Sequence, residues 1–252
     1  MKVNTMKRSM RAGSPVVGAE LALGNPLAGE VFSLAGFDFV QVDMQHGMWT
    51  DDTALQAFHR ICLGQATPSV RVVANDYAAI GRVLDRGALT VIVPMVNSPE
   101  EAHAAAQAVR YPPRGRRSSG APTGYLTYDA DYGEATNDEI CLMVQIETKE
   151  AVAAARDILS VDGVDGCMIG PSDLGKSLGP SVDQAEQARM QLQVRDICLE
   201  LGRFPGIATG GPGAEQHLRE GFLFVLSTGD FGILTEGATR TRSWLDDVRA
   251  SL

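Results

Sequence analysis

The sequence predicts a (β/α)8 barrel, the α/β fold in which eight parallel strands close into a cylinder surrounded by helices. Short apolar runs alternate with amphipathic segments along all 252 residues, a pattern typical of repeated strand–helix units. The hydrophobic fraction of 44% is enough for one large core. No Gly-x-Gly-x-x-Gly turn follows the first apolar run, which counts against the alternative fold, an open doubly wound sheet. No internal break divides residues 1–252, so we expect a single domain.

The first half of the chain predicts four strand–helix pairs. Three of the helices begin at sequences that favour helix capping, namely Asn25-Pro26, Thr50-Asp51 and Ser98-Pro99. Gly36 and Gly87 are typical of helix ends. The predicted strands are 16–22, 37–43, 68–73 and 89–95, and the predicted helices are 26–35, 52–64, 76–86 and 98–108.

The second half repeats this alternation after one long interruption. The predicted strands are 141–147, 164–169, 204–209 and 222–228, and the predicted helices are 149–158, 184–202, 213–220 and 232–250. Residues 111–139 are too many for an ordinary connection in a compact domain. This stretch and the residue before it carry Arg110, Arg114, Arg116 and Arg117. Two interpretations stay open, a functional or mobile loop and a plain solvated surface loop.

Charge and cysteine usage exclude several classes of protein. The net charge of −9 counts against binding of nucleic acid or of an anionic membrane. No apolar run is long enough to span a membrane, and the N-terminus lacks the apolar part of a secretory signal. Four cysteines, Cys62, Cys141, Cys167 and Cys198, lack the spacing of a metal or disulfide motif. We therefore expect reduced thiols in a cytoplasmic protein.

Two carboxylates, Glu147 and Asp173, each follow an apolar run and lie 26 residues apart, about one strand–helix–strand repeat. Active sites of (β/α)8 barrels lie at the carboxyl ends of the strands, so both acids are expected at one rim. Paired carboxylates there can hold a divalent cation that faces a pocket. A proton-transfer pair and an ion-pair network remain as alternatives.

The ends of the second and third predicted strands add Asp43, His46 and Arg71 to the same rim. His46 is the one histidine placed after a strand, because the other three fall within predicted helices. An arginine near a strand end needs an anionic partner, which is either a substrate or, in an interior salt bridge, Asp43 or Glu147.

The glycine-rich turns after the last three predicted strands can bind anions through free backbone N–H groups. They are Gly170 to Gly175, Thr209 to Gly213 and Ser227 to Asp230. A barrel enzyme that acts on a phosphorylated sugar or indole is thus one alternative, and plain turn chemistry is another.

Lysine usage separates two routes for breaking a carbon–carbon bond. The chain has only Lys2, Lys7, Lys149 and Lys176, and none is predicted to be desolvated inside the barrel, as a Schiff-base mechanism requires. A metal-assisted route is favoured.

Taken in order, these segments resemble the HpcH/HpaI aldolase family over almost the whole chain. The shared motifs are Gly36-Phe37-Asp38, Asp43-x-Gln45-His46, Val70-Arg71, Pro94-Met95-Val96, Arg110-Tyr111-Pro112-Pro113-Arg114-Gly115, Gln145-Ile146-Glu147-Thr148, Val164-Asp165-Gly166 and Ile169-Gly170-Pro171-Ser172-Asp173-Leu174. Each motif is weak alone, but their order and spacing are highly specific.

The resemblance implies a class II aldolase that cleaves 4-hydroxy-2-oxo acids into pyruvate and an aldehyde, or runs the reverse reaction. It implies Mg²⁺, Mn²⁺ or Co²⁺ on Glu147 and Asp173 and no organic cofactor. Pyruvate would be positioned by Gln145 and by the backbone near Gly170, Ser172 and Asp173.

The resemblance also implies roles for the other rim residues. Arg71 would stabilise the enolate oxygen, and Asp43 with His46 would move protons through a water. Asp85 matches a position that reaches the aldehyde pocket of a neighbouring subunit. Family members are typically hexamers, trimers of dimers with exchanged C-terminal helices.

Two positions depart from the better-known family members. Gln45 stands where many have a glutamate, and Glu20 stands where relatives tend to have a bulky apolar residue. Glu20 either forms a structural ion pair or faces the pocket and disfavours anionic aldehydes. Two other functions stay open, an acyl-CoA lyase of the citrate-lyase type and a barrel that binds a keto acid without turnover.

Overall fold

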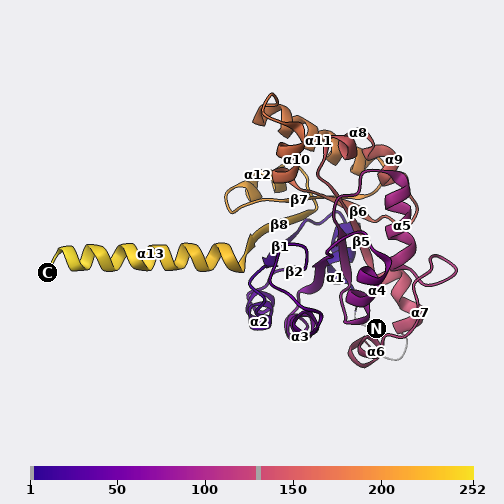
Figure 1. The fold of residues 1–252 in the computed structure, drawn as a ribbon, viewed down its shortest axis with the longest axis horizontal. Coiled ribbons are helices and arrows are strands. Elements are labelled where there is room, and N and C mark those ends of the chain that lie inside the picture. The colour runs from indigo at the N-terminus through magenta and orange to yellow at the C-terminus, as the bar shows by residue number, and fades with distance from the viewer. Residues whose placement is uncertain (1–2, 129–131) are drawn as a thin grey trace.

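A closed barrel of eight parallel strands forms the centre of the protein (Figure 1). The computed structural model describes residues 3–128 and 132–252. Each strand pairs with the next one along the chain, and the last pairs with the first. The strands are β1 (Val16–Leu21), β2 (Phe39–Asp43), β3 (Thr67–Arg71), β4 (Thr90–Val93), β5 (Cys141–Ile146), β6 (Gly166–Ile169), β7 (Phe204–Ala208) and β8 (Phe224–Gly229). The predicted fold class is confirmed.

Side chains alternate along each strand between the barrel interior and the outer wall. The interior is packed by large apolar residues, among them Phe39 and Phe224, whose stacked rings have centroids 4.0 Å apart. Met6 and Met10 of α1 (Thr5–Arg11) belong to the same buried cluster. Helix α1 was not predicted, because it is short and its apolar residues form only two turns of pattern. It covers the barrel interior at the end away from the predicted site.

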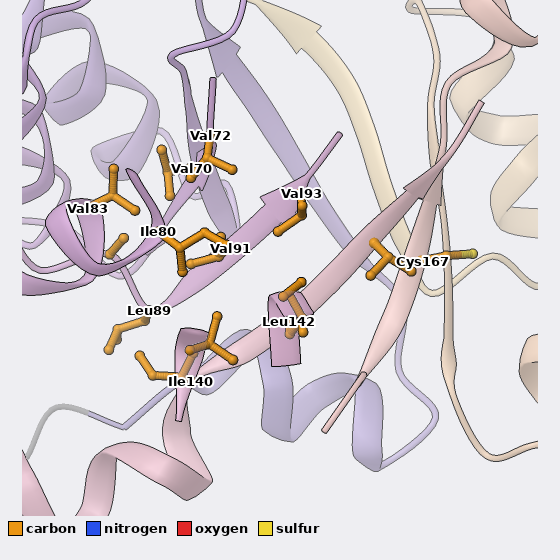
Figure 2. Packing of buried hydrophobic residues seen from close by; sticks show 14 of the residues in the cluster. Val70, Val72, Ile80, Val83, Leu89, Val91, Val93, Ile140, Leu142 and Cys167 are labelled. Carbon is orange, nitrogen blue, oxygen red and sulfur yellow. The ribbon is translucent and has the colours of Figure 1, made fainter. Parts of the chain in front are cut away.

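The outer wall packs against the surrounding helices (Figure 2). Val70 and Val91 on neighbouring strands lie beside Ile80 and Val83 of α4 (Tyr77–Asp85), and all four are fully or almost fully buried. This double burial explains why the strands read as short continuous apolar runs in the sequence.

Most of the predicted helices are present. They are α2 (Pro26–Leu34), α3 (Asp51–Ile61), α4, α5 (Pro99–Val109), α11 (Gln184–Glu200), α12 (Gly213–Arg219) and α13 (Asp230–Ala250). The side chains of Asn25, Thr50 and Ser98 accept backbone N–H groups at the helix starts, as their positions predicted.

Three parts of the prediction were wrong. The helix predicted at 149–158 is two helices, α8 (Lys149–Ala153) and α9 (Ala155–Ser160), that meet at Ala154. The turn after β6 opens directly into a further helix, α10 (Pro171–Leu178). Residues 111–139 are not simply a loop, because they contain α6 (Pro122–Tyr128) and α7 (Tyr132–Glu139); part of this segment, 129–131, lies outside the described residues.

Helix α13 projects away from the barrel instead of packing along it (Figure 1). Its only buried residue is Asp230 at its start. Several of its large apolar side chains are exposed, namely Phe231, Ile233, Leu234, Trp244, Leu245 and Val248. In the described part of the chain, no helix combines the length and apolarity needed to cross a membrane. All four cysteines are free thiols, as predicted.

Candidate active site

The pairing of β2 with β3 sets Asp43 and Arg71 side by side at the carboxyl end of the barrel. The Arg71 guanidinium donates from Nε to Asp43 Oδ1 at 2.8 Å and from Nη2 to Asp43 Oδ2 at 2.7 Å. Such a two-pronged contact fixes the plane of the guanidinium. Asp43 is buried and Arg71 nearly so, so the pair is largely shielded from water. The salt bridge to Asp43 foreseen from the sequence is present.

Asp43 also orders the loop that follows β2. Its Oδ1 accepts the backbone N–H groups of Gln45 at 3.1 Å and of His46 at 3.4 Å. The carboxylate therefore contacts the His46 backbone, and no described contact joins it to the imidazole ring. Asp43 and His46, which were predicted as a pair, lie close together. Asp43 bonds to the backbone of the loop and thereby fixes the position of the loop.

Glu20 of β1 faces the same group of side chains. Its Oε2 accepts from Gln41 Nε2 at 3.2 Å and lies 3.7 Å from Arg71 Nη2. Burial raises the pKa of Glu20, and repulsion from Asp43 adds to this, although Arg71 opposes both effects. Glu20 was expected either to form an ion pair or to face the pocket. It does both, because it lies 3.7 Å from Arg71 Nη2 and borders an open cavity.

Glu147 lies directly after β5 and is buried. Its Oε1 accepts the backbone N–H of Met95 at 2.8 Å, and its Oε2 accepts from the amide of Gln145. Met95 has a φ of 56°, which is uncommon for a residue with a side chain. Burial raises the pKa of Glu147, and Asp173 raises it further by repulsion.

The turn from β6 to α10 brings the second carboxylate to Glu147. Asp173 lies in the first turn of α10, and its Oδ1 contacts Lys176 Nζ at 2.9 Å. Gly170 precedes the helix, and a Cβ added there would lie 2.7 Å from Glu147 Oε2 and 2.9 Å from Gln145 Nε2. Only glycine leaves room for these two side chains.

These residues can hold a divalent cation through oxygen atoms. Two carboxylates repel each other across the rim, and Gln145 Oε1 is buried with no hydrogen-bond partner among the described residues. Carboxylate and amide oxygens are the ligands of hard cations. No group of three or more His, Cys, Asp or Glu side chains around a metal position occurs among the described residues.

A cavity of about 710 Å³ opens beside this group toward β1, β7 and β8. Glu20 and Ser172 border it on the side of the carboxylates, and residues of the glycine-rich turns after β7 and β8 form much of its wall. The pocket thus extends from Glu20, which lies 3.7 Å from Arg71, to the start of α10.

Comparison with known proteins identifies this arrangement. Residues 21–226 match the model of the HpcH/HpaI aldolase/citrate lyase family, a stretch that includes every rim residue described above except Glu20. The chain belongs to this family. Its members catalyse aldol-type cleavage, so the protein is an aldolase, a carbon–carbon lyase.

Individual relatives of this HpcH/HpaI family member cover nearly all of its length. It is 36% identical over 242 residues to the 4-hydroxy-2-oxo-heptane-1,7-dioate aldolase of Salmonella paratyphi C (strain RKS4594), which covers 93% of this chain and 92% of the relative. A family protein from Burkholderia cenocepacia J2315 superimposes with a TM-score of 0.89 at 28% identity, covering 98% and 99% of the two chains. The citrate synthase SbnG superimposes with a TM-score of 0.84 at 26% identity, covering 97% and 98%.

Asp85 is the one predicted site residue of this HpcH/HpaI family member that lies away from the rim. Helix α4 runs back along the barrel, and the backbone N–H of Leu89 just after it bonds to Pro68 O at the start of β3. Asp85 Oδ1 accepts from Arg117 Nη2 at 2.7 Å. Within one chain Asp85 therefore cannot contact a substrate at Arg71. A role in a neighbouring subunit's pocket stays a prediction.

Two contributors to the site were not foreseen from the sequence. The N–H of Met95 and the side chain of Gln41 both bond to site carboxylates. The unusual φ of Met95 leaves no trace in residue type, whereas Gln41 was detectable as a polar residue inside an otherwise apolar strand.

Proposed function

We propose that this family member is a metal-dependent pyruvate aldolase that cleaves 4-hydroxy-2-oxo acids into pyruvate and an aldehyde, and also catalyses the reverse addition. The observation that carries the proposal is the convergence of Glu147, Asp173 and Gln145 with the Arg71–Asp43 pair at one rim. The names of the relatives support a 4-hydroxy-2-oxo acid as the substrate class.

Glu147 and Asp173 would hold Mg²⁺, Mn²⁺ or Co²⁺, and Gln145 Oε1 would face the bound pyruvate unit. The cation supplies electrostatic stabilisation of the negative charge that develops on the keto oxygen when the carbon–carbon bond breaks. Two protein carboxylates leave positions for an oxo acid that binds through two oxygens.

Arg71 would stabilise the same oxygen by its positive charge. Its Nε and Nη2 are occupied by Asp43, and Nη1 makes no hydrogen bond to the part of the chain that the structure describes. A guanidinium held in a fixed orientation before the reaction stabilises developing charge without having to reorganise. Asp43 is therefore a positioning residue for Arg71 and for the His46 loop.

His46 accepts the proton of the 4-hydroxyl group, directly or through a water. The backbone N–H groups at Ser172 and Asp173 begin α10, and the free N–H groups of a helix start suit the carboxylate of the oxo acid.

The decisive experiment is pyruvate release from a panel of 4-hydroxy-2-oxo acids, coupled to a pyruvate-consuming reporter. We expect turnover that disappears after chelation with EDTA and returns with Mg²⁺ or Mn²⁺. Full activity after complete metal removal would contradict the metal role. Binding of the acids without any pyruvate release would instead favour a barrel that only binds keto acids.

The alternative of an acyl-CoA lyase receives little support from the basic loop. Arg117 pairs with Asp85, Arg110 Nη2 pairs with Asp165 at 2.9 Å, and Arg114 pairs with Asp138 at 2.6 Å. These three arginines neutralise acids of the same chain, and only Arg116, which is exposed, has no acidic partner among the described residues, so the loop offers little positive charge for CoA phosphates.

We also propose that two subunits exchange α13 and that dimers of this kind assemble into a hexamer. The exposed apolar residues of α13 are a large surface for an isolated helix to leave in water. Leu27, Val31 and Leu34 of α2 are exposed as well. A second copy of the chain is the partner that would cover both surfaces by one symmetric exchange.

A further inference from the structure

We propose that Glu20 makes this aldolase select aldehydes whose far end is neutral and carries hydroxyl groups, and makes it reject aldehydes that end in a carboxylate. The inference rests on the proposed function and concerns the part of the substrate that leaves as the aldehyde.

Glu20 lies where the variable part of the substrate must pass. Its Oε2 is 3.7 Å from Arg71 Nη2, and Arg71 is the residue proposed to face the reacting oxygen. The same side chain is about 29% exposed and borders the 710 Å³ cavity. A substrate whose pyruvate part is held at Glu147 and Asp173 extends its remaining carbons into this cavity.

The wall of the cavity is predominantly acidic. Its acidic residues are Glu20, Asp230 and Glu236, and no lysine or arginine lines it in the described part of the chain. Its histidine, His217, is held by Glu220 through a contact of 3.0 Å from Nδ1 to Oε2. Arg71, the nearest cation to Glu20, is already paired with Asp43 through two hydrogen bonds. A carboxylate that enters this cavity loses water and meets like charge, which costs free energy.

Glu20 offers the cavity a hydrogen-bond acceptor. Its Oε2 accepts from Gln41 Nε2 at 3.2 Å, and no hydrogen bond to its Oε1 occurs among the described residues. A carboxylate can only accept hydrogen bonds, whereas a hydroxyl group can donate. Hydroxyl groups on the aldehyde therefore complement this part of the site and carboxylates do not. Thr209, Ser227 and Thr228 add hydroxyl groups to the same wall.

The test compares two substrates of equal length, 4-hydroxy-2-oxo-heptane-1,7-dioate and 4,7-dihydroxy-2-oxoheptanoate, in the wild type and in Glu20→Gln. For the wild type we expect kcat/KM to favour the dihydroxy acid by about tenfold, since like charges brought together in a partly buried pocket cost roughly that much. Glu20→Gln keeps the size and the contact with Gln41, so the preference should shrink by a similar factor. The ratio of the two substrates cancels any general effect on Arg71.

Glu215→Gln is the matched control. Glu215 is exposed on α12, pairs with Arg219 and does not line the cavity, so it makes the same change in net charge far from Glu20. Its substrate ratio should equal that of the wild type. An equal shift in both variants would overturn the assignment to Glu20, and so would a wild type that prefers the dioate.

Failure of the proposed function is distinguished by a second readout. Binding of both compounds to the metal-loaded protein is measured by calorimetry in parallel. If neither compound releases pyruvate, the aldolase proposal fails, and the ratio of binding constants in the wild type and Glu20→Gln still supports or refutes the charge selection.

Discussion

At the scale of single residues, a substitution of Arg71 tests whether this arginine is catalytic or only structural. Two hydrogen bonds pair its Nε and Nη2 with Asp43, whereas Nη1 makes no hydrogen bond among the described residues and is available to a substrate oxygen. We expect Arg71→Ala to lower kcat by roughly 100-fold or more, the effect of losing one donor to a developing oxyanion. Steady-state kinetics with a 4-hydroxy-2-oxo acid that the wild type cleaves measure this change in kcat. A near-normal kcat with reduced thermal stability would show that Arg71 is only the partner of Asp43.

The metal ligands give a second prediction at this scale. Glu147→Gln and Asp173→Asn remove one charge each with little change in shape, and we expect each to weaken Mn²⁺ binding strongly in calorimetric titrations. Glu215→Gln removes one charge from an exposed residue of α12 that does not line the cavity and is the control. Unchanged affinity in both ligand variants would refute the assignment.

The third prediction concerns the pH dependence of stability. Burial first, and Asp43 next, raise the pKa of Glu20 above its usual range near 4.5. The folded state therefore holds this proton more tightly than the unfolded state, so the stability associated with Glu20 falls as pH rises from the ordinary carboxyl range through the raised pKa. Glu20→Gln has no proton to lose, and its free energy of unfolding should exceed that of the wild type above this range.

Urea unfolding of the metal-free wild type, Glu20→Gln and Glu215→Gln across this pH range provides the measurement. The difference between wild type and Glu20→Gln should grow with pH, while that for Glu215→Gln should stay flat, since Glu215 is exposed. A pH-independent difference for Glu20→Gln would mean that its charge is not destabilised in the folded protein.

At the scale of elements, the junction of β6 and α10 matters most to the site. Gly170→Ala would place a methyl group against Glu147 and Gln145, and we expect a loss of about 1–3 kcal/mol in stability together with weaker metal binding. Gly81→Ala in α4 meets no atom within 4 Å and should leave metal affinity unchanged while stabilising its helix by up to about 1 kcal/mol. Normal metal affinity in Gly170→Ala would show that the carboxylates tolerate displacement.

The region around this junction also shows which strands and helices can be predicted from the sequence and which cannot. The strands were predicted well because burial on both sides makes each one a short apolar run. Helix α10 was interpreted as a turn, because Gly170 and Pro171 are typical of turns and only the position of the proline at the first helical turn indicates a helix. Helix α6 was missed because it has only 7 residues, and α7 was missed because it has almost no apolar periodicity.

At the scale of the whole molecule, the proposed exchange of α13 makes a prediction about assembly. Trp244→Asp puts a charge on the exposed apolar surface of this helix, and we expect the proposed hexamer to dissociate in sedimentation velocity experiments. Ser243→Asp adds the same charge at the neighbouring polar position and should leave the assembly intact. A wild-type protein that sediments as a monomer would contradict the exchange of helices directly.

The sequence alone was sufficient to predict the barrel and the placement of Asp43, His46, Arg71, Glu147 and Asp173 at one rim, because parallel strands bring every strand end to one rim whatever the side-chain details. Their roles in catalysis and metal binding stay predictions. The tertiary structure decided which of these residues touch. Asp43 bonds to Arg71 and to the His46 backbone, Asp85 lies away from the rim, and Glu20 borders the cavity. Such contacts depend on rotamers and strand register across the barrel, which sum many weak long-range interactions that leave no local pattern in the chain.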